Sequence, residues 1–178
     1  MRAIRLLLAV VLATPLAACA PADSPGLPRC TAIERLGLIA QAVPSASYVP
    51  CLAQLPAGWS TEAFDVRRAA MTVKLVSDRA QGPAVSLRFS RSCRTAGAAP
   101  FPARTLGGRT YLRLRTLRPR FAGTLIDAFP GGCVQYRFDF VRGQHIALMA
   151  QLQSAVGFRS RVQLRQELRH RLGVELRS

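Results

Sequence analysis

Several segments in the middle of the chain alternate apolar and polar residues with the period of two that is typical of β-strands. The clearest are residues 71–75, 85–89, 111–115 and 134–140. Residues 121–129 form a further apolar run of strand length. Residues 77–83, which end in Gly-Pro, are predicted to form a hairpin loop between the first two strands. The pattern therefore predicts about five strands.

Helical spacing precedes these strands. Apolar residues recur at the spacing of one helical face, at Ile33, Leu36, Ala40 and Val43. Thr31 and Glu34 have the T-x-x-E spacing of a capping box, and Pro44 cannot continue a helix. We therefore expect an N-terminal helix that starts after Thr31 and stops before Pro44.

Two more helices are predicted at the C-terminal end. Residues 144–156 are expected to form the first, which would stop at Gly157 as a C′ glycine. The second opens with a Ser160/Gln163 capping box, repeats leucine at every fourth position, and ends at Gly173. Its arginines are expected to point to solvent: Arg161, Arg165, Arg169 and Arg171.

The predicted elements follow the order helix, strands, helices. Such segregation favours an α+β fold with an antiparallel sheet. We expect one face of the sheet to pack on the helices and the other to be polar and rich in arginine. Trp59, the single tryptophan, is expected in the core beside the start of the sheet.

The first 18 residues are organised like an export signal. Arg2 and Arg5 are followed by 13 uncharged, mostly apolar residues, fewer than the roughly 20 that a membrane span needs. The sequence Leu-Ala-Ala-Cys at residues 16–19 then resembles the lipobox of bacterial lipoproteins. This resemblance implies cleavage before Cys19 and a diacylglycerol on its thiol. A plain signal peptide that contains a cysteine is the alternative.

These features divide the chain into three parts. Residues 1–18 are predicted to be a lipoprotein signal peptide, and residues 19–29 a lipid-anchored cysteine with a proline-rich tether. Residues 30–178 are predicted to form a single α+β domain outside the cytoplasm. The protein is then expected at the extracytoplasmic face of the cell membrane, held there by its lipid.

Four cysteines remain in the predicted domain: Cys30, Cys51, Cys93 and Cys133. An even number in an exported domain suggests disulfides, and three connectivities are possible. We favour Cys30–Cys51 and Cys93–Cys133, because each closes a loop around neighbouring elements. No closely spaced pair of cysteines or histidines occurs, so neither a metal nor another cofactor is expected.

The chain is strongly basic. Its formal charge of +16 falls to +14 without residues 1–18, because only Arg2 and Arg5 are lost. Such a surface attracts anionic polymers, lipid head groups or an acidic protein. Nucleic acid is not an expected partner, since an exported, anchored protein rarely meets it and no nucleic-acid-binding signature is present.

Five cations share the polar face of their predicted strands: Lys74, Arg88, Arg113, Arg115 and Arg137. Neighbouring strands are expected to bring them together as a basic patch. Guanidinium groups suit phosphate or carboxylate through paired hydrogen bonds. The alternative is a solvated charged face that discourages aggregation.

No catalytic motif is visible. The chain lacks G-x-S-x-G and a phosphate-binding loop, and its two histidines are expected on helices. Asp127 and Asp139 lie on predicted neighbouring strands, where they could form a carboxylate pair for glycoside hydrolysis or each pair with an arginine.

The segments PSASYVPCLAQLPAGW and FPGGCVQYRFDF resemble uncharacterised secreted and lipoprotein sequences of high-GC Gram-positive bacteria. The resemblance supports the compartment and the disulfides and implies no activity. We expect a non-enzymatic envelope lipoprotein that contacts an anionic partner. An envelope hydrolase or transferase with an unrecognised carboxylate site is one alternative, and an accessory subunit of a membrane complex, joined through apolar helix faces, is another.

Overall fold

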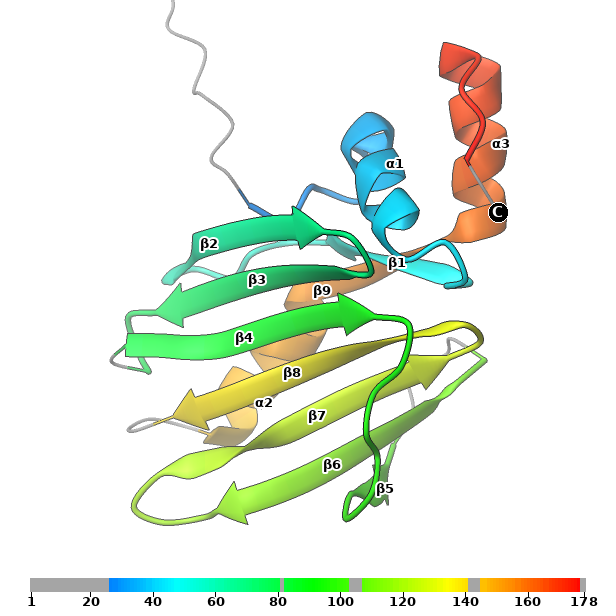
Figure 1. Cartoon of the computed structure of the whole chain (residues 1–178). Coiled ribbons are helices and arrows are strands. Elements are labelled where there is room, and N and C mark those ends of the chain that lie inside the picture. Colours follow the sequence, from blue (N-terminus) through cyan, green and yellow to red (C-terminus); the bar gives the residue numbers. More distant parts are fainter. Residues whose placement is uncertain (1–25, 81, 103–106, 141–144, 177–178) are drawn as a thin grey trace, which may run out of the picture.

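A computed structural model describes residues 26–80, 82–102, 107–140 and 145–176 (Figure 1). The predicted signal peptide, Cys19 and the first part of the predicted tether lie outside these residues. The helices are α1 (Ile33–Ala42), α2 (His145–Ala155) and α3 (Arg161–Leu172). The strands are β1 (Tyr48–Leu52), β2 (Trp59–Arg67), β3 (Ala70–Ser77), β4 (Gly82–Ser90), β5 (Ala99–Phe101), β6 (Arg109–Thr116), β7 (Phe121–Phe129), β8 (Gly132–Phe140) and β9 (Val156–Ser160).

The predicted fold class is confirmed: the chain is α+β, and its strand pairs are antiparallel. The predicted number of about five strands is wrong. The main sheet has seven strands in the order β2-β3-β4-β8-β7-β6-β5, and β1 and β9 form a separate two-stranded ribbon. Gly157 lies in this ribbon opposite Cys51, so its prediction as a helix C′ residue is also wrong.

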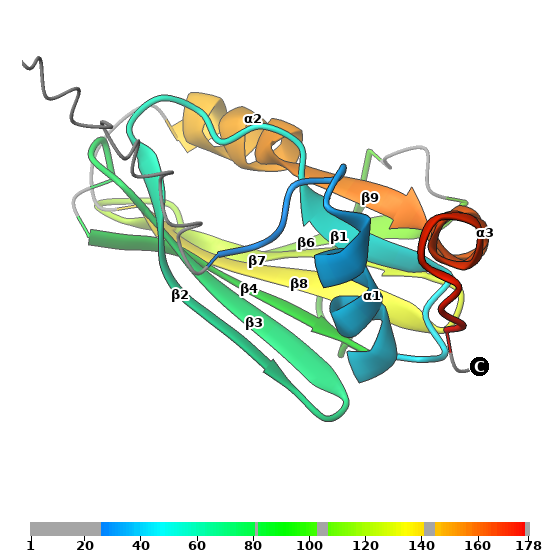
Figure 2. The same ribbon diagram turned by 90° about the horizontal axis from the view of Figure 1, so that it is seen from above.

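The helices and the β1–β9 ribbon lie on one side of the sheet (Figure 2). The apolar residues of the central strands point to this side and are almost completely buried, as the alternation predicts. They are Met71, Val73 and Leu75 on β3, Val85, Leu87 and Phe89 on β4, and Val134, Tyr136, Phe138 and Phe140 on β8. Trp59 is buried as expected, and its indole donates a 3.0 Å hydrogen bond to Gln151 on α2. We call the opposite side the outer face.

Both predicted disulfides are present. Cys30 and Cys51 join the start of the α1 region to β1, with their Cα atoms 4.9 Å apart. Cys93 and Cys133 join the segment after β4 to the start of β8, with a Cα separation of 6.1 Å. The first bond therefore fastens the helical layer, and the second fastens a connection to the sheet.

Residues 26–29 belong to the folded domain. Leu27 is buried, and the Leu52 amide donates a 2.8 Å hydrogen bond to the carbonyl of Pro28. Arg29 forms a parallel bridge with Leu52 of β1. The last four residues of the predicted tether therefore form an ordered arm against β1.

The helix ends differ in part from the prediction. Neither capping box forms, since α1 begins after Ala32 and α3 after Ser160 without a side-chain cap. Gly173 does end α3 in the left-handed conformation, and its amide bonds to the Arg169 carbonyl. Within the residues that the structure describes, no helix has the length and apolar character needed to cross a membrane.

The prediction that every arginine of α3 points to solvent is wrong at the start of the helix. Arg161 is only 6% exposed, and Arg165 is half-buried. Arg169 and Arg171 are exposed as expected.

Candidate anion-binding face

Strand register places three of the predicted cations in one row across the outer face. Lys74 on β3 pairs with Ser86 on β4, which pairs in turn with Arg137 on β8. On its other side Arg137 pairs with Thr124 on β7, and Thr124 pairs in turn with Arg113 on β6. Directly paired residues project from the same face of a sheet. The row therefore has a cation on every second strand, at intervals of about 10 Å.

Arg88 lies two residues after Ser86 on β4 and projects from the same outer face. It pairs with Thr72 on β3 and with Gln135 on β8, which makes it the diagonal neighbour of Arg137. Diagonal neighbours have Cα atoms about 7–8 Å apart, within reach of a shared ligand for two arginine side chains. These side chains surround a groove of about 340 Å³, lined by Thr72, Ser86, Arg88, Gln135 and Arg137. We call this the basic groove.

The basic groove has the chemistry of an oxyanion site. Arg88 and Arg137 are exposed, and in the described part of the chain neither forms a hydrogen bond or ion pair with another side chain. Their planar guanidinium groups present paired N–H donors that match phosphate and carboxylate oxygens. The hydroxyls of Thr72 and Ser86 and the amide of Gln135 add uncharged donors at the floor of the groove.

Arg113 and Arg115 do not join the groove. The Arg113 guanidinium donates a 2.9 Å hydrogen bond to the carbonyl of Arg94, so this side chain is held at the margin of the outer face. Arg115 lies where the β6–β7 register shifts between Leu114 and Thr116, and it has no cross-strand partner. The structure therefore brings together Lys74, Arg88 and Arg137 and separates the other two predicted cations from them.

The connection from β4 to β5 runs across the outer face in front of β8, β7 and β6 (Figure 1). The Cys93–Cys133 disulfide attaches this crossover segment, residues 91–98, to the sheet. It carries two further exposed arginines, Arg91 and Arg94, on the same side as the basic groove. Both arginines follow the alternating part of the strand, so the period of two does not mark them; the adjacent Cys93 is the signal that the sequence offers.

Asp139 is an acidic residue on the outer face, opposite Ala122. Arg120 donates two hydrogen bonds to its carboxylate, of 2.9 and 2.8 Å. The hydrogen bond and then the negative charge of Asp139 raise the pKa of Arg120. Asp65, the cross-strand partner of Thr72 on the same face, is likewise paired with an arginine, Arg67.

Of the two arrangements considered for Asp127 and Asp139, the carboxylate pair does not form, and Asp139 pairs with an arginine. Asp127 pairs with Val134 and points to the core, where it accepts a 2.9 Å hydrogen bond from Thr110. Asp139 projects from the outer face, so the two carboxylates lie on opposite sides of the sheet. In the described ranges, no three histidine, cysteine, aspartate or glutamate side chains gather as potential metal ligands.

No protein-family model and no curated protein matches the chain. A crystal structure of a protein from Bacteroides thetaiotaomicron is similar over 74% of this chain, with 8% identity and a TM-score of 0.37. The chain spans 60% of the length of that protein. A similarity this distant carries no argument about function.

Proposed function

We propose that this protein is a lipid-anchored protein of the bacterial cell envelope that binds an anionic partner through the basic groove and has no catalytic role. The observation that carries the proposal is the placement of Arg88 and Arg137 as diagonal neighbours in a groove lined by polar side chains, with no ion pair to either arginine among the described residues. A charged face that only discourages aggregation needs no particular arrangement of hydrogen-bond donors. Here the charges are accompanied by hydrogen-bond donors at matched positions, as recognition requires.

The anchor rests on the sequence, because Cys19 lies outside the described residues. Gly26, the first residue that the structure describes, is seven positions after Cys19, so the domain can lie at most about 25 Å from its lipid. This short reach keeps the basic groove near the membrane surface and its polymers. Lipid head groups and envelope polymers are therefore the anionic partners nearest to the groove.

Two alternative functions compete with this proposal. A hydrolase or transferase needs an unrecognised carboxylate site, and Asp127 and Asp139 do not supply it, because they lie on opposite sides of the sheet. An accessory subunit was inferred from apolar helix faces that were free to dock. The core-facing sides of α1 and α3 are buried, at Leu36, Ile39, Leu164 and Leu168. Leu38 on α1, Ile146 on α2 and Val162 on α3 are exposed and are the apolar side chains left for such an interface.

Charge-matched variants test the proposed binding. We expect Arg88→Gln/Arg137→Gln to weaken binding to sodium polyphosphate and to phosphatidylglycerol vesicles by at least about tenfold, because two charge-assisted contacts are lost. The control is Arg29→Gln/Arg171→Gln, which removes the same charge from exposed positions outside the groove. Equal loss in both variants would show that net charge alone drives binding and would contradict the proposal.

The anchor has its own test. In the native host, Cys19→Ala should move the protein from the membrane fraction to the soluble extracytoplasmic fraction. Metabolic labelling with a fatty acid should mark the wild-type chain and leave the variant unlabelled. Retention of the variant in membranes without label would show that the lipid is not the anchor.

A further inference from the structure

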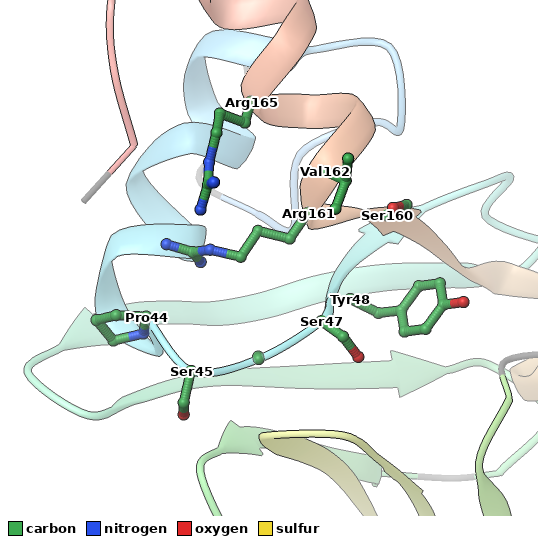
Figure 3. Close-up of a pocket in the computed structure, with 9 residues that line it drawn as sticks. Pro44, Ser45, Ser47, Tyr48, Ser160, Arg161, Val162 and Arg165 are labelled. Carbon is green, nitrogen blue, oxygen red and sulfur yellow. The ribbon is translucent and has the colours of Figure 1, made fainter. Parts of the chain in front are cut away.

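A second pocket lies on the helical side of the molecule, away from the outer face. It has a volume of about 550 Å³ and lies between the α1–β1 connection and the start of α3 (Figure 3). Its polar lining residues are Ser45, Ser47, Ser160, Arg161 and Arg165. The rest of the wall is apolar and comes from Pro44, Ala46, Val162 and the ring of Tyr48.

Two guanidinium groups meet at this pocket. Arg161 and Arg165 lie one turn apart on α3, and both side chains extend toward the last turn of α1 and toward each other (Figure 3). Arg161 donates a 2.8 Å hydrogen bond to the carbonyl of Ala40, at the end of α1. Burial and then the positive charge of Arg165 lower the pKa of Arg161. The fold thus holds two like charges close together where little water reaches one of them.

The same pocket contains buried polar atoms that the protein does not satisfy. In the described part of the chain, the Nε atom of Arg165 and the hydroxyl oxygen of Ser47 are buried and have no hydrogen-bond partner. Buried polar atoms are almost always paired, so such atoms require an explanation. By contrast, the hydroxyl of Ser45 is already engaged with the carbonyl of Gly131, at 2.6 Å.

We propose that this pocket binds a small molecule with one oxyanion group, a phosphate or a carboxylate. Arg165 is the principal ligand of the oxyanion, and Arg161 strengthens the local positive potential from its fixed position beside α1. In Figure 3 the Ser47 hydroxyl points away from the two guanidinium groups, so it meets a second polar atom of the ligand. The apolar wall formed by Pro44, Val162 and Tyr48 accommodates a compact carbon skeleton between them.

This pocket is independent of the basic groove. The basic groove is lined by polar side chains alone and suits an extended polyanion. The pocket is larger, has a mostly apolar wall and presents its cations from one helix end. A small organic acid or phosphate ester therefore fits it better than a polymer.

The test measures binding of inorganic phosphate, acetate and phenyl phosphate to the mature chain by calorimetry and by the shift in thermal midpoint. We expect Arg165→Gln to weaken binding by at least about tenfold, as expected for loss of a charge-assisted contact. The control Arg171→Gln removes an exposed charge from the same helix and should bind within about twofold of wild type. Ser47→Ala should weaken phenyl phosphate binding severalfold, which keeps the proposal testable if Arg165→Gln fails to fold.

The outcomes separate the ligand classes and the two sites. Tighter binding of phosphate than of acetate supports a phosphate ligand, and the reverse order supports a carboxylate ligand. The Arg88→Gln/Arg137→Gln variant should retain binding in the pocket, whatever its effect on polyanions. Wild-type affinity in both Arg165→Gln and Ser47→Ala, or no binding of any probe by the wild-type chain, would overturn this assignment.

Discussion

Cys93 is bonded to Cys133 at the edge of the basic groove. Cys133 pairs with Ser90 in the β4–β8 ladder, and the next pair on the same face joins Arg88 to Gln135. The disulfide thus fixes the crossover segment next to the two residues that begin the groove. It links the covalent frame of the domain to the proposed binding surface.

Removal of this disulfide is predicted to affect both stability and binding. Cys93→Ser/Cys133→Ser should lower the free energy of unfolding by about 4 kcal/mol, because it opens a loop that spans 40 residues. It should also weaken polyphosphate binding, since Arg91 and Arg94 are then no longer held beside the groove. Denaturant unfolding and calorimetric titration measure the two effects.

The other disulfide is the control for this prediction. Cys30→Ser/Cys51→Ser opens a loop that spans 21 residues and should cost about 3 kcal/mol of stability. Its bond lies on the helical side of the sheet, so polyphosphate affinity should be unchanged. Equal loss of affinity in the two double variants would show that the crossover segment has no particular role.

Substitution of Asp139 is predicted to increase polyphosphate affinity. This carboxylate is the acid that lies on the outer face next to Arg137 along β8, and it holds Arg120. Asp139→Asn removes the negative charge and frees the guanidinium of Arg120 for a ligand. Polyphosphate affinity should therefore rise severalfold at low salt, with the gain shrinking as salt screens the face. An unchanged or lower affinity would speak against electrostatic recognition there.

Gly157 is predicted to be intolerant of a side chain. A Cβ atom at this position would lie 2.9 Å from the Sγ atom of Cys30 and 3.3 Å from the Cβ atom of Ala53. The sulfur is fixed in a disulfide and cannot move aside. Gly157→Ala should therefore lower the free energy of unfolding by about 1–3 kcal/mol.

A double-mutant cycle checks the cause of this loss. In the Cys30→Ser/Cys51→Ser background the smaller, mobile hydroxyl can give way, so Gly157→Ala should cost less than in the wild type. The same cost in both backgrounds would place the clash elsewhere.

Arg161 has a structural role that Arg171 lacks. Its bond to the Ala40 carbonyl satisfies one of the last acceptors of α1. Arg161→Gln should lower the free energy of unfolding by about 1–3 kcal/mol, because a buried charge-assisted hydrogen bond is lost. Arg171→Gln, at an exposed position of the same helix, should change it by less than about 0.5 kcal/mol. Comparable losses would mean that Arg161 contributes no more than a surface charge.

The sequence predicted the central strands well and the edge of the sheet poorly. In β3, β4 and β8 an unbroken alternation follows one buried face. In β2, a bulge between Thr61 and Ala63 shifts the register. Trp59 and Thr61 therefore share a face with Phe64 rather than with residue 63, and the period of two disappears from the sequence.

The β1–β9 ribbon was missed because long-range geometry decides it. Residues 156–160 contain no alternation of their own, and Gly157 resembles a helix terminator. A side chain is excluded there by the close approach of the Cys30–Cys51 disulfide, whose two cysteines lie more than 100 positions before Gly157 in the chain. No local pattern carries that information.

The arginines of α3 were predicted to be exposed to solvent because arginine is usually found at the surface. The spacing itself contained the correct signal, since Arg161 precedes Leu164 by three residues and Leu168 by seven. These three side chains share one helical face, and all three are buried. The acceptor that makes burial possible, the end of α1, lies 121 residues away and was invisible in the sequence.

The most direct test of the central claim is to map the polyphosphate contact by nuclear magnetic resonance. Titration should shift the side-chain Nε–Hε signals of Arg88 and Arg137 and the amide signals of Thr72, Ser86 and Gln135 at the same ligand concentration. Signals of the helical side, such as those of Arg29 and Arg171, should stay in place. Shifts spread evenly over all exposed arginines, or shifts that leave the basic groove untouched, would contradict the account.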